Sequence, residues 1–270
     1  MGNEVHKMKK YFRVIRMMLI NNLQYIWDMV LGSIHFVLII FIFVNLWQYL
    51  YGSGKAMISG YDISQMIWYL IVTELITIGT RTAITRGGIS DEVKSGSISY
   101  ILNKPINYIG YQFSNFVGEV IVKLIFYIPL SLIVGFVMIG ELKNFNFTYI
   151  PFMIIVIVLG IIVDFFLRVV VGLLAFWVED TSPFFWMYGK FLLVFGVFFP
   201  VELFPKVIAD IVKASPIAAI VYGPGKIVVD FSFETFWSII GIQIIYLILS
   251  IALAVFVYQK GVKKLNVNGG

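Results

Sequence analysis

Residues 150–178 read IPFMIIVIVLGIIVDFFLRVVVGLLAFWV, an apolar run that contains only two charged residues, Asp164 and Arg168. A helix needs roughly 20 mostly apolar residues to cross a hydrocarbon core of about 30 Å. The run exceeds that length. It therefore predicts a transmembrane helix.

Five further stretches meet or approach this length: 29–50, 63–80, 116–139, 184–199 and 236–258. The stretch that ends at residue 199 is short, and Pro200 directly after it can stop, kink or redirect a helix. No span repeats another at a fixed period, and no linker divides the chain. The sequence predicts an all-α integral membrane protein with six transmembrane helices in a single domain, residues 1–270.

The composition excludes a water-soluble globule. Of the 270 residues, 60% are hydrophobic and 13% charged, whereas a soluble domain is nearer half apolar and a quarter charged. Cysteine is absent, so the chain has no disulfide framework, thiolate metal site or thiol nucleophile. The net charge of +5 is better read through the placement of Lys and Arg than as a nucleic-acid signal. We expect no nucleic-acid partner.

The positions of Lys and Arg set the expected orientation. With the N-terminus inside, 12 of them are cytoplasmic: five before the first span, four between the second and third, and three after the sixth. The outer loops carry five, namely Lys55, Lys143, Lys206, Lys213 and Lys226. Short cytoplasmic loops are the basic ones. Both termini of this multi-pass protein are therefore expected in the cytoplasm.

The basic segment before the first span does not match a signal peptide, because its apolar run is too long and no small-residue cleavage site follows. Met8, Phe12, Ile15 and Leu19 recur every three or four residues. This spacing favours an amphipathic helix in the membrane interface. The alternative is a charged flank that only sets the topology.

A second segment that does not span is 86–105, RGGISDEVKSGSISYILNKP. Ser90 is a suitable N-cap, Asp91 and Glu92 favour the positive end of a helix dipole, and Gly96 is a natural helix stop. The pattern predicts one to two helical turns on the cytoplasmic face, with Pro105 breaking the chain before the third span. An ordinary connecting loop is the alternative.

Between the fifth and sixth spans the chain is apolar but interrupted by Pro and Gly, and no continuous 20-residue helix fits. Short helices that dip into the outer leaflet and return would fit, provided that protein buries their loose backbone ends. The residues that mark this predicted re-entrant segment are Pro200, Glu202, Pro205, Pro216 and Tyr222. A plain extracellular loop is the alternative.

Six ionisable residues lie within the predicted spans: Glu74, Glu119, Lys123, Asp164, Arg168 and Lys190. The middle four form two pairs at i, i+4, on one helix face each, where opposite charges can neutralise each other. Glu74 has no cation within a turn, and Lys190 could pair with a carboxylate on another helix. Such groups line a substrate path or proton relay, or else join packed helices. We interpret His35 as a packing residue rather than a ligand.

Several catalytic signatures are absent from the sequence. Gly223-Pro-Gly-Lys226 lacks the upstream glycine and the following Ser or Thr of a Walker loop. There is no H-E-x-x-H or G-x-S-x-G motif, and the chain has two histidines, so a histidine-based hydrolase or metal site is not expected. The energy for any transport must come from an ion gradient or from a separate subunit.

Two regions resemble a known family, the bacterial type-two ABC exporter permeases, and in particular their short six-helix subgroup. Residues 93–107 resemble its cytoplasmic pattern I-R-S-G-x-L-D-x-x-L-x-x-P-x-N, with Val93, Lys94, Ile98 and Ser99 in place of Ile, Arg, Leu and Asp. Residues 175–183, 199–205 and 215–216, AFWVEDTSP, FPVELFP and SP, resemble the last third of these permeases. The two regions occur in the expected order.

The resemblance implies a permease subunit of an ATP-driven exporter in the bacterial inner membrane. The N-terminal amphipathic helix would be an elbow helix, and the helices after Pro200 would be outer re-entrant helices. The coupling helix that docks on the ATPase would be formed by Ser90, Asp91, Glu92, Val93, Lys94, Ser95 and Gly96.

The expected partners are two copies of an ABC ATPase subunit that binds ATP and Mg, a second permease that is identical or homologous, and membrane lipid. The chain itself would bind no cofactor and would not be an enzyme, and its substrate would be an amphipathic drug, lipid or peptide. An ion-coupled secondary transporter or channel using Glu74, Glu119 and Asp164 is the alternative, and a membrane assembly factor without transport is a third class.

Overall fold

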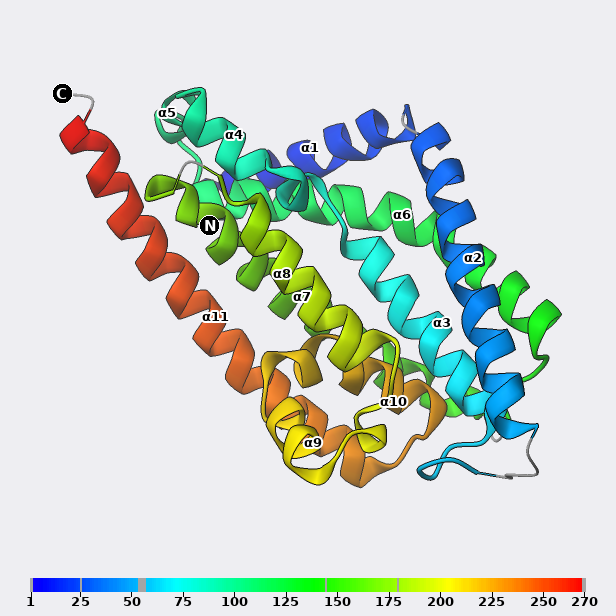
Figure 1. Cartoon of the computed structure of the whole chain (residues 1–270). Helices are drawn as coiled ribbons and strands as arrows, with labels where there is room; N and C mark the ends of the chain where they lie inside the picture. The colour runs from blue at the N-terminus through cyan, green and yellow to red at the C-terminus, as the bar shows by residue number, and fades with distance from the viewer. Residues whose placement is uncertain (1, 25, 53–56, 144, 179, 269–270) are drawn as a thin grey trace.

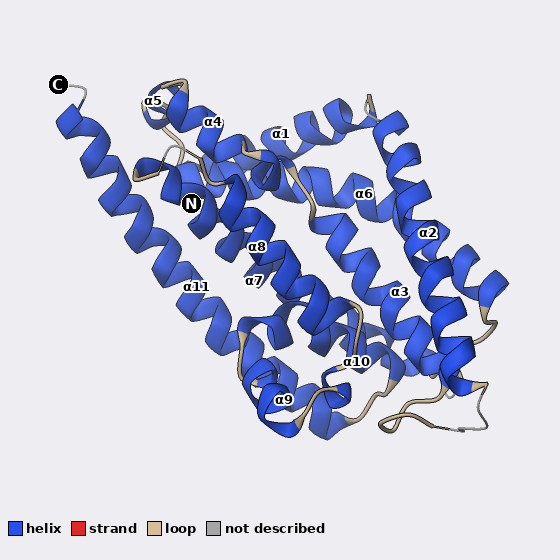
Figure 2. Ribbon diagram, in the orientation of Figure 1, coloured by secondary structure: helices blue, strands red, loops and turns tan. Residues whose placement is uncertain are grey.

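The computed structural model describes residues 2–24, 26–52, 57–143, 145–178 and 180–268. In these residues the chain is helical, apart from connecting turns and an isolated bridge between Ile58 and Tyr61. Five helices are long and apolar enough to cross a membrane: α2 (Ile26–Tyr51), α3 (Ile63–Thr80), α6 (Tyr108–Met138), α7 (Ile150–Leu173) and α11 (Phe233–Asn268). The prediction of an all-α integral membrane protein is confirmed (Figure 2).

The central helix of the bundle is α3. In its most apolar window 72% of the residues are buried, against 22% to 44% in the other four long helices. Large apolar side chains cover the outer faces of those helices, among them Leu38, Phe41 and Ile248. Lipid tails are as apolar as leucine, so these faces are suited to a bilayer.

The predicted fifth span is a shorter helix. α8 (Ser182–Leu192) has 11 residues and continues into a π-helix of five (Leu193–Val197). At 1.5 Å per residue the two segments reach about 24 Å, which is less than the hydrocarbon thickness of about 30 Å. The helix starts two residues before the predicted 184–199 because Pro183 occupies its first turn, a position where proline is well tolerated. The six predicted spans correspond to five long helices and this shorter one.

The predicted start of the third span, residue 116, is wrong by eight residues. α6 begins at Tyr108, where the Asn107 side chain caps it by accepting a hydrogen bond from the Gly110 amide at 2.9 Å. Polar residues such as Gln112 lower the hydropathy of this first part of the helix, so hydropathy alone did not include it in the span. The fourth span agrees better with its prediction, because short 3-10 turns, Phe147–Tyr149 and Leu174–Phe176, extend α7 at both ends.

The N-terminal helix α1 (Gly2–Leu23) packs along the first half of α6. A Cβ on Gly118 of α6 would lie 3.0 Å from the Ile15 carbonyl oxygen, so glycine permits the close approach of the two helices. Phe12, predicted to face lipid, is 68% exposed. Met8 also belongs to the predicted apolar stripe, but its side chain is not among those that the structure describes. Figure 1 shows α1 meeting α2 at a sharp corner.

The cytoplasmic segment contains a 3-10 turn (Ala83–Arg86), α4 (Gly88–Lys94) and α5 (Ile98–Leu102). The prediction that Ser90 is the N-cap is wrong: the N-cap is Gly87, three residues earlier, with a φ of +95°. Gly96 has a φ of +71° directly after α4, which agrees with the predicted stop, because glycine adopts positive φ without a steric penalty.

Two short helices follow Pro200, as predicted. After a 3-10 turn (Val201–Leu203), α9 (Lys206–Lys213) leads to a π-helix (Ala218–Tyr222) that continues into α10 (Gly223–Val229), and the two parts are bent by 77°. Figure 1 places α9 and α10 at the end of the molecule opposite to α1, α4 and α5. Both chain ends lie towards the side of α4 and α5, as an even number of spans requires.

Candidate functional site

The inner face of α4 is anchored on α7. Ile89 is fully buried, and a Cβ on Gly172 of α7 would lie 2.9 Å from its Cδ1 atom. Because Gly172 has no side chain, it leaves the space in which the Ile89 side chain packs against α7. Ser90 is also buried, and its hydroxyl has no hydrogen-bond partner in the described part of the chain.

Glu92 connects α4 to α6. Its Oε2 atom accepts a hydrogen bond from the Tyr108 hydroxyl at 2.6 Å and another from the Gln112 side-chain amide at 2.9 Å. The Tyr108 ring stacks on that of Tyr258 in α11, with 5.7 Å between the ring centroids. Burial raises the pKa of the Glu92 carboxyl above its ordinary value, and the two hydrogen bonds partly oppose this shift. The side chain thus links α4 to two long helices.

The opposite face of α4 is free to meet another molecule. Asp91, Lys94, Ser95 and Gly96 are exposed, whereas Val93 is half-buried against the core. The Ser95 hydroxyl donates to the Asp91 carbonyl at 2.7 Å and closes the last turn. Of the residues predicted to couple to an ATPase, Ser90, Glu92 and Val93 therefore face inward and the other four face outward.

The raised pKa of Glu92 makes a pH-dependent prediction. A carboxyl whose folded-state pKa is raised stabilises the fold fully below its ordinary value of 4.5, and this stabilisation is lost as the pH rises through the folded-state value. We expect Glu92→Gln, which keeps an acceptor but carries no charge, to flatten this part of the pH dependence. Glu92→Leu leaves Tyr108 and Gln112 without their acceptor and is expected to cost about 1–3 kcal/mol.

Thermal unfolding of the purified protein between pH 5 and pH 8 measures both effects. The difference between wild type and Glu92→Gln isolates Glu92 from other carboxylates. A difference that stays constant over the whole range would contradict the assignment.

The Asp164–Arg168 pair predicted from i, i+4 spacing is present and buried in α7. The Arg168 Nε atom lies 2.7 Å from Asp164 Oδ2, and the two residues are 6% and 0% exposed. Tyr188 of α8 donates to the other carboxylate oxygen at 2.6 Å, and an Arg168 NH2 group donates to the Thr80 hydroxyl at 3.4 Å. The pair therefore joins α7 to α8 and α3, which agrees with a role in joining packed helices.

The predicted Glu119–Lys123 pair is also present, at 3.1 Å in α6. Glu119 accepts a hydrogen bond from the Ala83 amide at 2.9 Å, and Lys123 donates to the Arg81 carbonyl. Both contacts reach the segment between α3 and α4. The pair therefore fixes the start of the cytoplasmic segment to α6.

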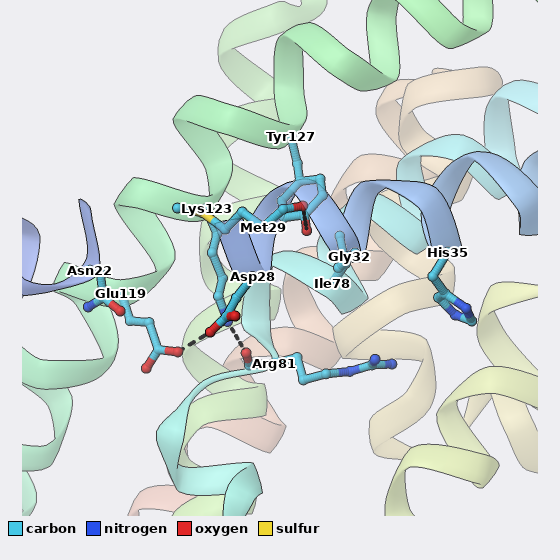
Figure 3. Close-up of a pocket in the computed structure, with 10 residues that line it drawn as sticks. All are labelled: Asn22, Asp28, Met29, Gly32, His35, Ile78, Arg81, Glu119, Lys123 and Tyr127. Atoms are coloured by element: carbon cyan, nitrogen blue, oxygen red, sulfur yellow. Dashed lines mark hydrogen bonds and ion pairs between the residues drawn. The ribbon is translucent and has the colours of Figure 1, made fainter. Parts of the chain in front are cut away.

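A polar cavity of about 670 Å³ opens beside this pair, between α1, α2, the end of α3 and α6. Its lining residues are Asn22, Asp28, Met29, Gly32, His35, Ile78, Arg81, Glu119, Lys123 and Tyr127. Figure 3 shows Arg81 and His35 at one end of it and Asp28, Glu119 and Asn22 at the other. His35 is exposed to this space, so the prediction of a packing residue is not supported.

Glu74 and Lys190, the remaining ionisable residues of the spans, lie in different surroundings. Glu74 is 2% exposed, and its Oε2 atom has no hydrogen-bond partner among the described residues. Lys190 is exposed, and its ammonium lies 5.6 Å from the centroid of the Trp186 ring. The proposed pairing of Lys190 with a carboxylate on another helix is therefore replaced by a cation–π contact.

At the opposite end of the molecule Glu202 is a hydrogen-bonding centre. It accepts hydrogen bonds from the hydroxyls of Tyr61, at 3.0 Å, and Tyr222, and the Lys213 ammonium lies 4.0 Å away. The marker residues Glu202 and Tyr222 thus meet directly. Their contacts hold the turn after α8, α9 and the π-helix together.

The three marker prolines of this segment lie at the starts of its short elements. Pro200 precedes the 3-10 turn, Pro205 precedes α9, and Pro216 lies where the chain turns into the π-helix. Proline is favoured at such positions because its φ is already helical and it needs no hydrogen bond there.

Some functional residues were missed by sequence reasoning. Tyr108 and Gln112 were not expected to bind Glu92, and Arg81 was read only as a topogenic charge. The spacing of Tyr108 and Gln112, four residues apart on one helix, is a signal that could have been used. Among the described residues, no group of three His, Asp or Glu side chains is placed to hold a metal ion.

Comparison with protein families gives a match over most of the chain. Residues 34–269 match the model of a family described as "ABC-2 family transporter protein", which covers most of the chain, including α4, the charged pairs and the segment after Pro200. No curated protein matches the sequence significantly.

Proposed function

Because the chain belongs to the ABC-2 family of membrane transporter proteins, we propose that it is the permease of an ATP-driven exporter whose energy comes from a separate ATPase subunit. The family forms the membrane component of transporters and is not itself catalytic. In this proposal two ATPase subunits bind ATP and Mg, and a second permease, identical or homologous, completes the path. The complex lies in the bacterial inner membrane with both termini of this chain in the cytoplasm.

The observation that carries the proposal is the two-sided surface of α4. Its outer face presents Asp91, Lys94 and Ser95 to solvent, while its inner face is fixed to α7 through Ile89 and to α6 through Glu92. A force applied to the outer face is therefore passed to two membrane helices. A partner can drive such a change only if its contacts differ between the two states of the permease.

The ion-coupled alternative is not favoured by the described contacts. It needs carboxylates that bind and release an ion, but two of its three, Glu119 and Asp164, are engaged by Lys123 and Arg168 within 3.1 Å and 2.7 Å. Only the third, Glu74, has no ion pair to a described residue. An amphipathic substrate, by contrast, is compatible with the polar cavity beside the apolar faces of the bundle.

Charge reversal on the outer face of α4 tests the proposal. Asp91→Lys combined with Lys94→Glu keeps the net charge and touches no buried contact. We expect the ATPase subunit to be lost on co-purification, and ATP-driven transport to fall at least tenfold, because a charge-complementary docking surface would then repel its partner. The unfolding temperature should stay within a few degrees of that of the wild type, since exposed substitutions cost about 0.5 kcal/mol or less.

Lys206→Glu combined with Asp210→Lys is the matched control. These residues are exposed and four positions apart, against three for Asp91 and Lys94, and they lie on α9 at the other end of the molecule. The control should bind the ATPase normally. If the α4 variant co-purified and transported like the control, the coupling role would be wrong.

A further inference from the structure

The polar cavity beside α2 has the size of a ligand site. Its volume of about 670 Å³ lies within the range of roughly 300–1,000 Å³ that is usual for small-molecule pockets. It lies near the corner between α1 and α2, towards the end of the molecule that carries α4 (Figure 1). None of its lining residues belongs to the outer face of α4.

The charges of the cavity are balanced. It is lined by two basic side chains, Arg81 and Lys123, and two acidic ones, Asp28 and Glu119. Lys123 and Glu119 already pair with each other, whereas Arg81 and Asp28 have no ion pair to any residue that the structure describes. A ligand that carries one positive and one negative group therefore complements the cavity better than a purely anionic or cationic one.

An apolar strip continues from the cavity along α2. His35 lines the cavity, and its neighbours one turn away on the same face, Leu31 and Leu38, are 66% and 53% exposed. Ile42, one further turn along, is 56% exposed. Residues three or four apart share a helix face, so these apolar side chains form a continuous strip. A molecule whose polar headgroup lies in the cavity could place its acyl chains along that strip.

The cationic part of the ligand can be narrowed further. Tyr127 is the one Phe, Tyr or Trp residue among the lining residues, and its hydroxyl donates to the Met29 carbonyl at 3.0 Å. Quaternary ammonium groups are usually recognised by cages of several aromatic rings. A primary ammonium instead donates hydrogen bonds to carboxylates such as Asp28.

We propose that this cavity binds the headgroup of a zwitterionic phospholipid with a primary ammonium and a phosphodiester. The phosphodiester contacts Arg81, which suits the planar donors of a guanidinium, and the ammonium contacts Asp28. The acyl chains lie along Leu31, Leu38 and Ile42. This inference deepens the proposed function. The role of the lipid as exported cargo rests on that function. The binding of the lipid headgroup in the cavity does not depend on it.

Lipid retention measures the binding directly. The protein is reconstituted in an equimolar mixture of phosphatidylethanolamine, phosphatidylcholine and phosphatidylglycerol, extracted, and analysed by native mass spectrometry. We expect phosphatidylethanolamine to be retained about tenfold above the other two, which corresponds to about 1.4 kcal/mol of preference. Arg81→Gln and Asp28→Asn should each remove most of this enrichment.

Lys190→Gln and Glu234→Gln are the controls, because both residues are exposed and lie outside the cavity. They should retain lipid as the wild type does. Equal retention of phosphatidylcholine, a preference for phosphatidylglycerol, or unchanged enrichment in both cavity variants overturns the proposal. The wild-type preference needs no variant, so the test does not depend on the folding of Arg81→Gln.

Addition of ATP to the complex with the ATPase subunit separates cargo from resident lipid. Cargo is released on turnover, so retained phosphatidylethanolamine falls, whereas unchanged retention overturns the cargo role. The proposed function is tested by a different experiment. It would fail if the α4 charge-reversal variant bound the ATPase normally.

Discussion

Replacing Asp164 by Leu is expected to destabilise the protein by about 3–5 kcal/mol, because it leaves the Arg168 guanidinium buried without its counter-ion. Arg168 is only 6% exposed and has Asp164 as its ion-pair partner at 2.7 Å. The same change removes the acceptor of the Tyr188 hydroxyl, so α8 loses a contact to α7. The free energy of unfolding in mixed micelles, or the loss of monodisperse protein on heating, measures the effect.

Two comparisons isolate the uncompensated charge. Asp164→Leu together with Arg168→Met removes both charges and should recover most of the lost stability, since apolar replacements of a buried pair are often neutral. Asp230→Asn breaks the pair with Lys226, in which the Asp230 side chain is 54% exposed, and should cost about 0–1 kcal/mol. Equal losses in Asp164→Leu and Asp230→Asn would show that the buried pair has no special role.

The two intramembrane pairs show what sequence spacing can and cannot predict. The i, i+4 separation within one helix identified both the Asp164–Arg168 and the Glu119–Lys123 pair, because helix geometry alone brings such residues together. Tyr188 is 24 residues away from Asp164, and its place beside the carboxylate depends on how α8 packs on α7. No local pattern contains that information.

In the cytoplasmic segment, local sequence predicted the C-terminal end of α4 but not its N-terminal start. Gly96 takes the positive φ that a helix stop needs, and few other residues do so readily. Ser90 was a reasonable N-cap on local grounds, but Gly87, three residues earlier, takes the N-cap position, and Ile89 and Ser90 become buried residues of the helix. Tertiary burial of Ile89 on Gly172 prevails over the capping preference of Ser90.

At the other end of the molecule, the prolines and glycines predicted broken helices correctly, because their effect on the backbone is local. The contact between Tyr61 and Glu202 spans 141 residues and could not be predicted from the sequence. The cavity was missed for the same reason: Asp28, Arg81 and Lys123 come from three separate segments, and the sequence paired Lys123 only with Glu119 in its own helix.

Substituting Gly160 by Leu is expected to disrupt the packing of α7 against the π-helix at residues 218–222. A Cβ at this position would lie 2.9 Å and 3.0 Å from the carbonyl oxygens of Ala219 and Ile220. These are backbone atoms and cannot rotate away. In lipid, small residues at helix contacts permit the close approach that holds helices together, so the bulky side chain must force α7 and the π-helix apart.

The loss in the free energy of unfolding should exceed that of ordinary overpacking, which is about 1–3 kcal/mol. The reason is that buried side-chain hydrogen bonds also cross this contact. The Gln243 side-chain amide of α11 donates to the Val156 and Ala219 carbonyls, both at 2.8 Å. Moving the π-helix breaks this bridge, so three helices lose their common contact. We expect little folded Gly160→Leu protein by size-exclusion chromatography.

Gly241→Leu is the matched control, because a Cβ at that glycine in α11 meets no atom within 4 Å. Gly160→Ala sharpens the argument, since replacing glycine by alanine inside a helix gains about 0.5–1 kcal/mol in helix propensity. A contact at 2.9 Å with a carbonyl oxygen costs more than that gain. Gly160→Ala should therefore unfold below the wild-type temperature and Gly241→Ala at or above it, and the reverse order would mean that α7 and the π-helix are not in close contact.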